Sequence, residues 1–331
     1  MKRIFVAIAV AALLSAACDD TTGPGSQPNP DGKVIAWFNG LANTIDLYYP
    51  GSDSLVSTAF VTGNVPNDLL YLGSDMLAVV NSTSSTLQIV DIAVSGSLLQ
   101  EITFPGGSNP WAMAYGYDNI WVSLLQKDQI VTVSTEDWTL GGAVDVPANP
   151  SGMAVAAGTI FVSHANWPDG TSPGGVTALD AITLDELGWI DTGVNTAWLS
   201  YFPETGHIHA FSSVSGADGV VSIIDPVTAT ISAQVQTGGN PQSPVRVGSS
   251  FACCDAWGSS IFFYSESGAL ISTWVPDSSM TSLAGLAVSG DTLYMTDFSG
   301  DLVHRALWQS QTLLTPLTAG NGPQGIIDVE R

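Results

Sequence analysis

The feature that most constrains this chain is a repeat of forty-odd residues that occurs seven times. Each copy opens near an Asn-Pro pair or its replacement, as in "NPWAMAYGYDNIWVSLL" at 109–125 and "NPSGMAVAAGTIFVSH" at 149–164. The equivalent positions are Pro66, Pro110, Pro150, Thr196, Pro241, Leu283 and Pro323, spaced by 44, 40, 46, 45, 42 and 40 residues. A steady period of this length predicts a repeat architecture, in which each copy builds one structural unit.

Each copy holds short runs rich in β-branched and aromatic residues, separated by turn residues. In the copy that starts at Pro150, "GMAVAA", "TIFVSH", "GVTALDA" and "LDELGWID" follow one another. Such runs predict β-strands, and the 34 glycines and 18 prolines of the chain supply the turns between them. Four strands per copy predict the blade of a β-propeller. Because blades pack face to face, both faces of each sheet are buried, and the strands need not alternate strictly between apolar and polar residues.

The two ends of the repeat predict how the ring closes. The repeat begins at "VIAWFNG", residues 34–40, which matches a second strand, and the third and fourth strands follow it. The missing first strand is present at the other end as "GIIDVE", residues 325–330. We therefore predict an all-β fold, a seven-bladed β-propeller of four-stranded antiparallel blades. Blade one joins three N-terminal strands to one C-terminal strand, which leaves no open sheet edge between the termini.

The segment before the repeat has the composition of an export signal followed by a tether. Residues 1–17 combine a basic start with an apolar run too short for a comfortable membrane span, and "SAAC" then ends at Cys18. This pattern resembles a bacterial lipoprotein signal, which implies a lipid on Cys18; the alternative is an ordinary secretory signal cleaved after Ala17. Residues 18–32 are polar and rich in Pro and Gly, which predicts a flexible tether, and residues 33–331 form the propeller. A lipid on a tether anchors a domain without spanning the membrane, so we expect the protein to face the periplasm or the cell surface.

The charge of the chain argues against one class of partner. It carries 30 acidic and 7 basic residues, a net charge of −23, and Lys2 and Arg3 leave with the signal. A surface this acidic is repelled by nucleic-acid phosphates and by anionic lipid headgroups. We therefore expect no nucleic-acid partner and contact with the membrane through the lipid only. We also expect a monomer.

Several short motifs resemble a known family. The second-strand ends "FVSH", "YMTD", "AVVN" and "WVSL" look like the Tyr-Val-Thr-Asn repeats of bacterial and archaeal seven-bladed propellers, the YVTN type. "VVSIIDPVTATISAQVQTGGNP", residues 220–241, is close to that family's third and fourth strands and the start of its next blade. The resemblance covers residues 33–331 and implies the propeller fold. The family is similar in layout to streptogramin lyases and lactonase-type propellers, and many members are surface or periplasmic proteins with no assigned reaction.

The blade order predicts where a site would lie. The loop before each first strand and the loop after each second strand emerge on one face, around the mouth of the central channel. Ligand-binding candidates on this face are Asn39, Asn81, Trp111, His164, Gln242, Asp255, Asp297 and Gln324, with Trp167 and Trp257 in nearby loops. Amides, carboxylates and aromatic rings together suit a sugar, a peptide or a small polar ligand. The alternative for the strand ends is that Asn and Asp bond their own turns.

Two carboxylates on this face form the candidate metal site. Asp255 and Asp297 end the second strands of adjacent blades, where they could meet and hold Ca²⁺ or Mg²⁺. The resemblance to lactonase-type propellers implies a centre of carboxylates and amides. Streptogramin lyases need His and Glu at the mouth, and the only histidine expected there is His164. No Ser-His-Asp order and no Gly-x-Ser-x-Gly motif is present to suggest a serine hydrolase.

Two further pairs are open to a structural or a chemical role. His207 and His209 share one face of a strand, as metal ligands might, but their place in the repeat favours blade packing or a surface position. Cys253 and Cys254 are adjacent, which would allow a strained disulfide ring; their mid-strand position favours two buried, free side chains instead.

The sequence thus predicts an envelope binding module without catalysis, whose partner is an envelope protein, a glycan or a small polar ligand. The alternative is a metal-assisted lyase or lactone hydrolase that uses Asp255, Asp297 and His164 at the channel mouth. A quinone-dependent dehydrogenase is disfavoured, because a chain with so few Lys and Arg lacks a basic clamp for a carboxylated cofactor.

Overall fold

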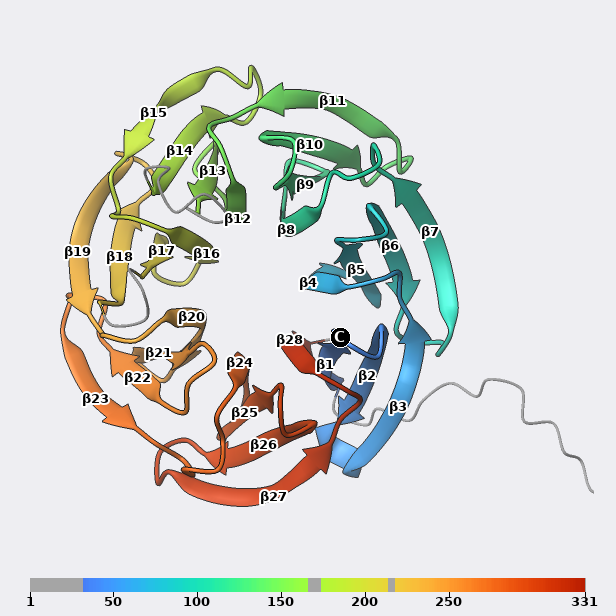
Figure 1. Cartoon of the computed structure of the whole chain (residues 1–331), viewed down its shortest axis with the longest axis vertical. Helices are drawn as coiled ribbons and strands as arrows, with labels where there is room; N and C mark the ends of the chain where they lie inside the picture. Colours follow the sequence, from blue (N-terminus) through green and yellow to red (C-terminus); the bar gives the residue numbers. More distant parts are fainter. Residues whose placement is uncertain (1–31, 166–173, 214–217, 331) are drawn as a thin grey trace, which may run out of the picture.

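A computed structural model of the chain shows a closed ring of seven four-stranded sheets (Figure 1). The structure describes residues 32–165, 174–213 and 218–330. The predicted signal peptide, Cys18 and Trp167 lie outside the described residues. Within the described ranges, no helix is long and apolar enough to cross a membrane.

Every innermost strand of the ring begins at a repeat anchor, as the sequence predicts. The innermost strands are β4 (Pro66–Gly73), β8 (Pro110–Gly116), β12 (Pro150–Ala156), β16 (Thr196–Phe202), β20 (Pro241–Val247), β24 (Leu283–Ser289) and β28 (Pro323–Glu330). The second strands are β1 (Lys33–Asn39), β5 (Met76–Asn81), β9 (Asn119–Leu124), β13 (Thr159–His164), β17 (His207–Ser212), β21 (Ser250–Asp255) and β25 (Thr292–Asp297). The repeat therefore marks both the start of each first strand and the end of each second strand.

The outer half of each blade completes the sheet. The third strands are β2 (Thr44–Tyr49), β6 (Thr86–Asp91), β10 (Gln129–Ser134), β14 (Gly175–Asp180), β18 (Val220–Asp225), β22 (Ile261–Tyr264) and β26 (Leu302–Leu307). The rim strands are β3 (Ser54–Val61), β7 (Ser97–Thr103), β11 (Leu140–Asp145), β15 (Glu186–Ile190), β19 (Thr230–Gln236), β23 (Leu270–Trp274) and β27 (Thr312–Thr318), and one short 3₁₀-helix, η1 (Pro50–Ser52), joins β2 to β3.

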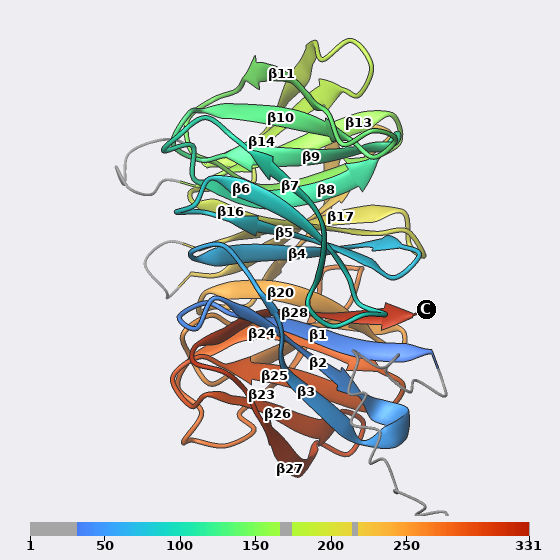
Figure 2. The ribbon, with the colours of Figure 1, turned by 90° about the vertical axis from the view of Figure 1, so that its right-hand side faces the viewer.

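The ring closes through blade one, as predicted. Its strand order is β28-β1-β2-β3, and β28 pairs antiparallel with β1 along a register that runs from Lys33 opposite Glu330 to Asn39 opposite Pro323. The start of β1 and the end of β28 therefore lie together on the face where second strands begin (Figure 2). The ends of the second strands, Asn39 among them, lie on the other face.

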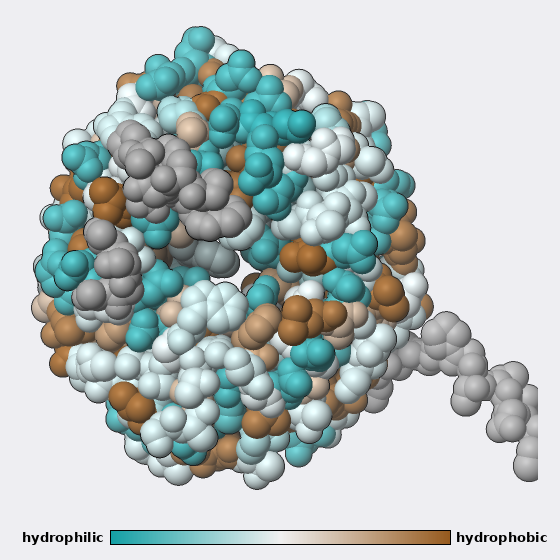
Figure 3. Space-filling model, viewed as in Figure 1, coloured by the Kyte–Doolittle hydropathy of each residue, from teal (hydrophilic) through white to brown (hydrophobic). Residues whose placement is uncertain are grey.

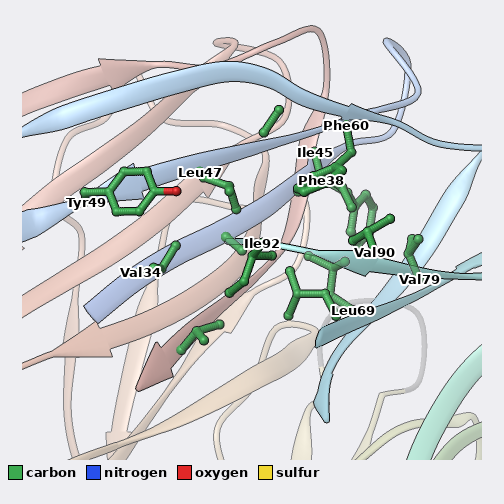
Figure 4. Close-up of a cluster of buried hydrophobic side chains, with 14 residues drawn as sticks. Val34, Phe38, Ile45, Leu47, Tyr49, Phe60, Leu69, Val79, Val90 and Ile92 are labelled. Carbon is green, nitrogen blue, oxygen red and sulfur yellow. The ribbon is translucent and has the colours of Figure 1, made fainter. Parts of the chain in front are cut away.

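The hydrophobic core is divided among the blade interfaces. Between blade one and the blade that contains β4, Phe38, Ile45 and Leu47 pack against Leu69 and Val79 (Figure 4). Strand β13 is buried at every residue, because neighbouring blades cover both faces of its sheet. Burying one side chain of the size of Leu or Phe contributes about 2 kcal/mol to stability, so the many buried side chains at each interface hold its two blades firmly together. The rim strand β27 is exposed at most of its positions.

The innermost strands share one irregularity that shapes the channel. The pairing register shifts between Pro66 and Asp68 in β4, and between Pro110 and Met113 in β8. Register shifts also occur near the starts of β12, β16, β20, β24 and β28. A β-bulge places an extra residue in one strand and re-aims the side chains around it. As a result, two successive residues after an anchor, such as Asn67 and Asp68, both line the channel.

Candidate functional site

A channel runs along the axis of the ring and holds three cavities. The mouth cavity, of about 190 Å³, lies on the face where the second strands end, and Figure 3 shows the hollow at the centre of that face. The middle cavity, of about 210 Å³, shares Trp198 and Gly325 with the mouth cavity. The far cavity, of about 450 Å³, shares Pro244, Leu286 and Ile326 with the middle cavity. Because neighbouring cavities share lining residues, the three lie next to one another along the axis of the ring.

Aromatic rings and side-chain amides line the mouth cavity together. The aromatic residues are Phe38, Trp111, Trp198 and Trp257, and the amides are Asn67, Gln242 and Gln324. Three of the predicted ligand-binding residues, Trp111, Gln242 and Gln324, therefore meet there, each contributed by the start of a different innermost strand. A concave surface that combines aromatic faces with a few amides is the usual lining of a site for a small ligand.

Hydrogen bonds between blades hold two of these amides in place. The Asn67 side-chain nitrogen donates to the backbone oxygen of Trp111 at 3.1 Å, and the Gln242 side-chain nitrogen donates to that of Ala284 at 3.0 Å. Each bond runs from one blade to the next around the ring. A side-chain amide has a second N–H and an oxygen, so each of these groups keeps hydrogen-bonding capacity for a ligand.

Trp257 adds a held but open aromatic face. Its side chain is 54% exposed, and its ring meets Phe298 edge-on, with centroids 5.2 Å apart. The backbone N–H of Trp257 donates to the oxygen of Leu283 at 3.0 Å, which ties the loop to the next blade. A ring positioned in this way presents a surface for stacking without the entropy cost of ordering a free loop.

The asparagines that end second strands are placed differently from the mouth residues. Asn39 and Asn81 are fully buried. Their side-chain nitrogens donate to the hydroxyl oxygens of Thr44 at 3.0 Å and Thr86 at 3.1 Å, at the start of the next strand of the same blade. Asn81 also donates to Gln88 at 3.1 Å. Both residues therefore bond across the turn that follows them, to the first residue of the next strand, which is close to the alternative role given by the sequence.

His164 is likewise enclosed at the end of its strand. Its Nδ1 lies 3.1 Å from the carbonyl oxygen of Ala148, its Nε2 lies 2.8 Å from the hydroxyl of Thr177, and its ring stacks on Trp189. A carbonyl oxygen only accepts, so Nδ1 carries the hydrogen and Nε2 accepts from Thr177. Burial lowers the pKa of His164 to about 4, so the ring is neutral at physiological pH.

The two predicted metal ligands each contact groups of their own blade. Asp255 accepts the backbone N–H of Asn240 at 2.8 Å. Asp297 is only 4% exposed, and its Oδ2 lies 3.4 Å from Nε2 of His304. Among the residues that the structure describes, no three His, Cys, Asp or Glu side chains form a group that could hold a metal ion. Binding of Ca²⁺ or Mg²⁺ by Asp255 and Asp297 stays a prediction.

The structure adds a carboxylate to the channel that the sequence did not single out. Asp68 follows Asn67 in β4 and lines the middle cavity. Its Oδ1 accepts the backbone N–H of Leu69 at 2.9 Å, and its Oδ2 accepts that of Met113, in the next blade, at 2.8 Å. Burial raises the pKa of Asp68 to about 7. The only sequence signal was its place two residues after an anchor.

The remaining histidine and cysteine pairs pack between blades. His207 contacts Glu266 at 2.7 Å, and His209 contacts the hydroxyl of Tyr264 at 2.9 Å. Cys253 and Cys254 are buried and free, and they belong to the hydrophobic clusters on opposite faces of their sheet.

No protein-family model matches the chain, and no curated protein matches it by sequence. Many solved structures share its fold. A protein of unknown function from Desulfotomaculum acetoxidans is 13% identical, with a TM-score of 0.70 over 88% of this chain and 98% of its own. AztD from Citrobacter koseri is 10% identical, with a TM-score of 0.65 over 90% and 97%. A streptogramin B lyase is 12% identical, with a TM-score of 0.65 over 89% and 91%. At these identities the likeness supports the seven-bladed fold and leaves function to the site.

Proposed function

We propose that the protein is an exported, lipid-anchored binding module whose mouth cavity takes a small polar ligand. The observation that carries the proposal is the convergence of three tryptophans and three amides on one cavity, from five innermost strands and one loop. Tryptophan faces provide apolar contact area, and the amides fix the orientation of a ligand through hydrogen bonds. The proposed function is binding without catalysis.

The direction of the chain supports the anchored arrangement. Strand β1 starts at Lys33 on the face opposite the mouth cavity (Figure 2). A tether of residues 18–32 reaches at most about 50 Å when extended. A lipid on Cys18 would therefore hold the propeller by its far face, and the mouth cavity would point away from the membrane, toward ligands in the envelope or outside the cell.

The alternative, a metal-assisted lyase or lactone hydrolase, has less support from the positions of its residues. His164 uses both ring nitrogens within its own blade, and Asp297 is almost fully buried. The alternative can be tested directly by metal binding. Calorimetric titration with Ca²⁺ and Mg²⁺ would show tight binding that is lost in both Asp255→Ala and Asp297→Ala.

Probe binding to the chain from residue 19 onward tests the proposed function, because all seven blades lie beyond that point. The calorimetric probes are chitobiose, glycyl-phenylalanine and 2-phenylethanol, which represent a glycan, a peptide and a small aromatic alcohol. We expect saturable binding of at least one probe, weakened about tenfold in Trp198→Ala, because the variant loses an aromatic contact face. Trp308→Ala is the matched control, since Trp308 packs beside a blade interface instead of lining the mouth cavity. Binding that Trp198→Ala leaves unchanged, or no binding of any probe, would contradict the proposal.

A further inference from the structure

The middle cavity brings an acidic group directly beneath the aromatic mouth. Trp198 and Gly325 line both cavities, so the middle cavity lies directly next to a ligand seated at the mouth. Asp68 lines this second space. Asp68 follows Asn67 directly in β4. The bulge in this strand turns both side chains toward the channel.

The carboxylate of Asp68 is held rigidly but keeps room for a ligand. Each of its oxygens accepts one backbone N–H, from Leu69 and from Met113. A carboxylate offers about four acceptor positions, so each oxygen retains one for a group that enters the channel. The two backbone bonds fix the direction of those remaining positions, which lowers the entropy cost of binding.

No basic side chain accompanies this acid. Among the described residues that line the middle cavity, none is Lys, Arg or His. The innermost strands beside β4 place Ala112 and Met113 of β8 and Ile326 of β28 around it, and none of these side chains titrates. The charged residues Glu204, Arg246 and Asp328 line the far cavity instead, where Arg246 lies 3.6 Å from the carboxylate of Glu204. Asp68 is half-buried, and a carboxylate partly removed from water is more stable when it is paired. A channel of this design therefore favours a ligand that brings its own positive charge.

We propose that the channel binds a small organic cation, a protonated amine whose ammonium group bonds Asp68 while its body contacts the tryptophans of the mouth cavity. This inference rests on the proposed function and names the chemical class of its ligand. The ammonium donates to the carboxylate oxygens, and the tryptophan faces add attraction for the same charge. The net charge of −23 raises the concentration of cations near the protein.

Proton release is a signature of this binding mode. The empty site has a carboxyl whose pKa burial raises to about 7. A bound ammonium stabilises the ionised form and lowers that pKa. Below pH 7, binding therefore releases a proton from Asp68, and the affinity falls by up to about tenfold for each pH unit of acidification.

Two matched pairs of probes test the proposal. 2-Phenylethylamine and 2-phenylethanol have the same shape and differ in charge, and phenylalanine amide differs from its N-acetyl form in the same way. The first pair represents a free amine and the second represents the N-terminus of a peptide. At pH 8 we expect at least one amine to bind ten times more tightly than its neutral partner. We also expect calorimetry in two buffers of different ionisation enthalpy to report proton release at pH 6.

Asp68→Asn and Ser243→Ala are the decisive variants. Ser243 lines the same cavity, and its hydroxyl accepts the backbone N–H of Leu286 in the next blade at 2.9 Å, so Ser243→Ala removes a similar blade-to-blade bond without removing charge. We expect the preference for the amine to vanish in Asp68→Asn and to persist in Ser243→Ala. Circular dichroism on each variant confirms that the propeller is folded; if Asp68→Asn does not fold, loss of the preference in wild type between pH 8 and pH 5 serves the same purpose.

The outcomes separate the two proposals. Equal affinity for an amine and its neutral partner, with both weakened in Trp198→Ala, would overturn the amine inference and leave the binding function standing. A preference for the amine that survives in Asp68→Asn would also overturn it. Absence of binding by all four probes, as well as by chitobiose and glycyl-phenylalanine, would overturn both proposals.

Discussion

The ends of the second strands and the starts of the innermost strands lie on one face of the ring and recur equally regularly in the sequence, but their side chains are used differently. Asn81 and His164 end second strands, are fully buried, and bond to the strand that follows in their own blade. Trp111 and Gln324 follow innermost-strand anchors and line an open cavity. A polar residue at the first position supports the blade, and one at the second position is available to a ligand.

The difference comes from what lies beside each strand. A second strand has a paired strand on both sides and a neighbouring blade over both faces, so a polar side chain at its end must find partners inside the blade. An innermost strand has a paired strand on one side only. Its other edge faces the channel, and the bulge near its start turns successive side chains toward that space. Position in the sheet, more than residue type, therefore separates side chains that support the blade from side chains that line the channel.

The sharpest test of this comparison is His164→Ala. The variant lacks the imidazole ring, which leaves a cavity against Trp189 and leaves the Thr177 hydroxyl without its hydrogen-bond partner. We expect the free energy of unfolding to fall by about 3 kcal/mol, measured by urea denaturation. Probe binding at the mouth should be unchanged while the protein is folded. A loss of binding without a loss of stability would place His164 in the ligand site and break the comparison.

A pair of amide truncations sharpens the comparison further. Asn81→Ala removes two buried hydrogen bonds, to Thr86 and Gln88, and should cost about 2 kcal/mol of stability. Gln324→Ala alters a residue that lines the mouth cavity and should change stability by less than about 0.5 kcal/mol. Urea midpoints of the two variants give the answer directly. Similar losses for both would mean that the two positions do not differ in role.

The sequence was sufficient to predict the fold, because the repeated positions hold residues with strong backbone preferences. Pro66 and the other anchors start every innermost strand, and the predicted second-strand ends, from Asn39 to Asp297, are the observed ones. It was not sufficient for the site. Strict alternation along β4 would point Asp68 away from the channel that Asn67 lines. The bulge reverses this direction, and no sequence motif marks its position. The enclosure of His164 depends equally on Trp189, a residue of a different strand.

The pH dependence of stability should have opposite signs for His164 and Asp68. The folded-state pKa of His164, about 4, lies below its unfolded value, so the unfolded chain binds more protons and His164 lowers stability as the pH falls from about 6.5 toward 4, by up to about 1.4 kcal/mol per pH unit. The pKa of Asp68, about 7, lies above its unfolded value, so Asp68 raises stability over the same acidification. Urea unfolding at pH 4.5, 5.5 and 6.5 should therefore show a shallower acid loss in His164→Gln and a steeper one in Asp68→Asn. Identical slopes in all three proteins would refute both assignments.

Trp257→Ala should have a small effect on stability and the most specific effect on binding. The ring is 54% exposed and contacts Phe298 by its edge, so its removal should lower the free energy of unfolding by less than about 1 kcal/mol. The same change removes one aromatic face of the mouth cavity, so the affinity for 2-phenylethylamine should fall about fivefold, measured by calorimetry. Trp257→Phe keeps an aromatic face and should recover most of the affinity. If both variants bind the amine as wild type does, the aromatic contact comes from the other rings of the mouth cavity, Phe38, Trp111 and Trp198, and not from Trp257.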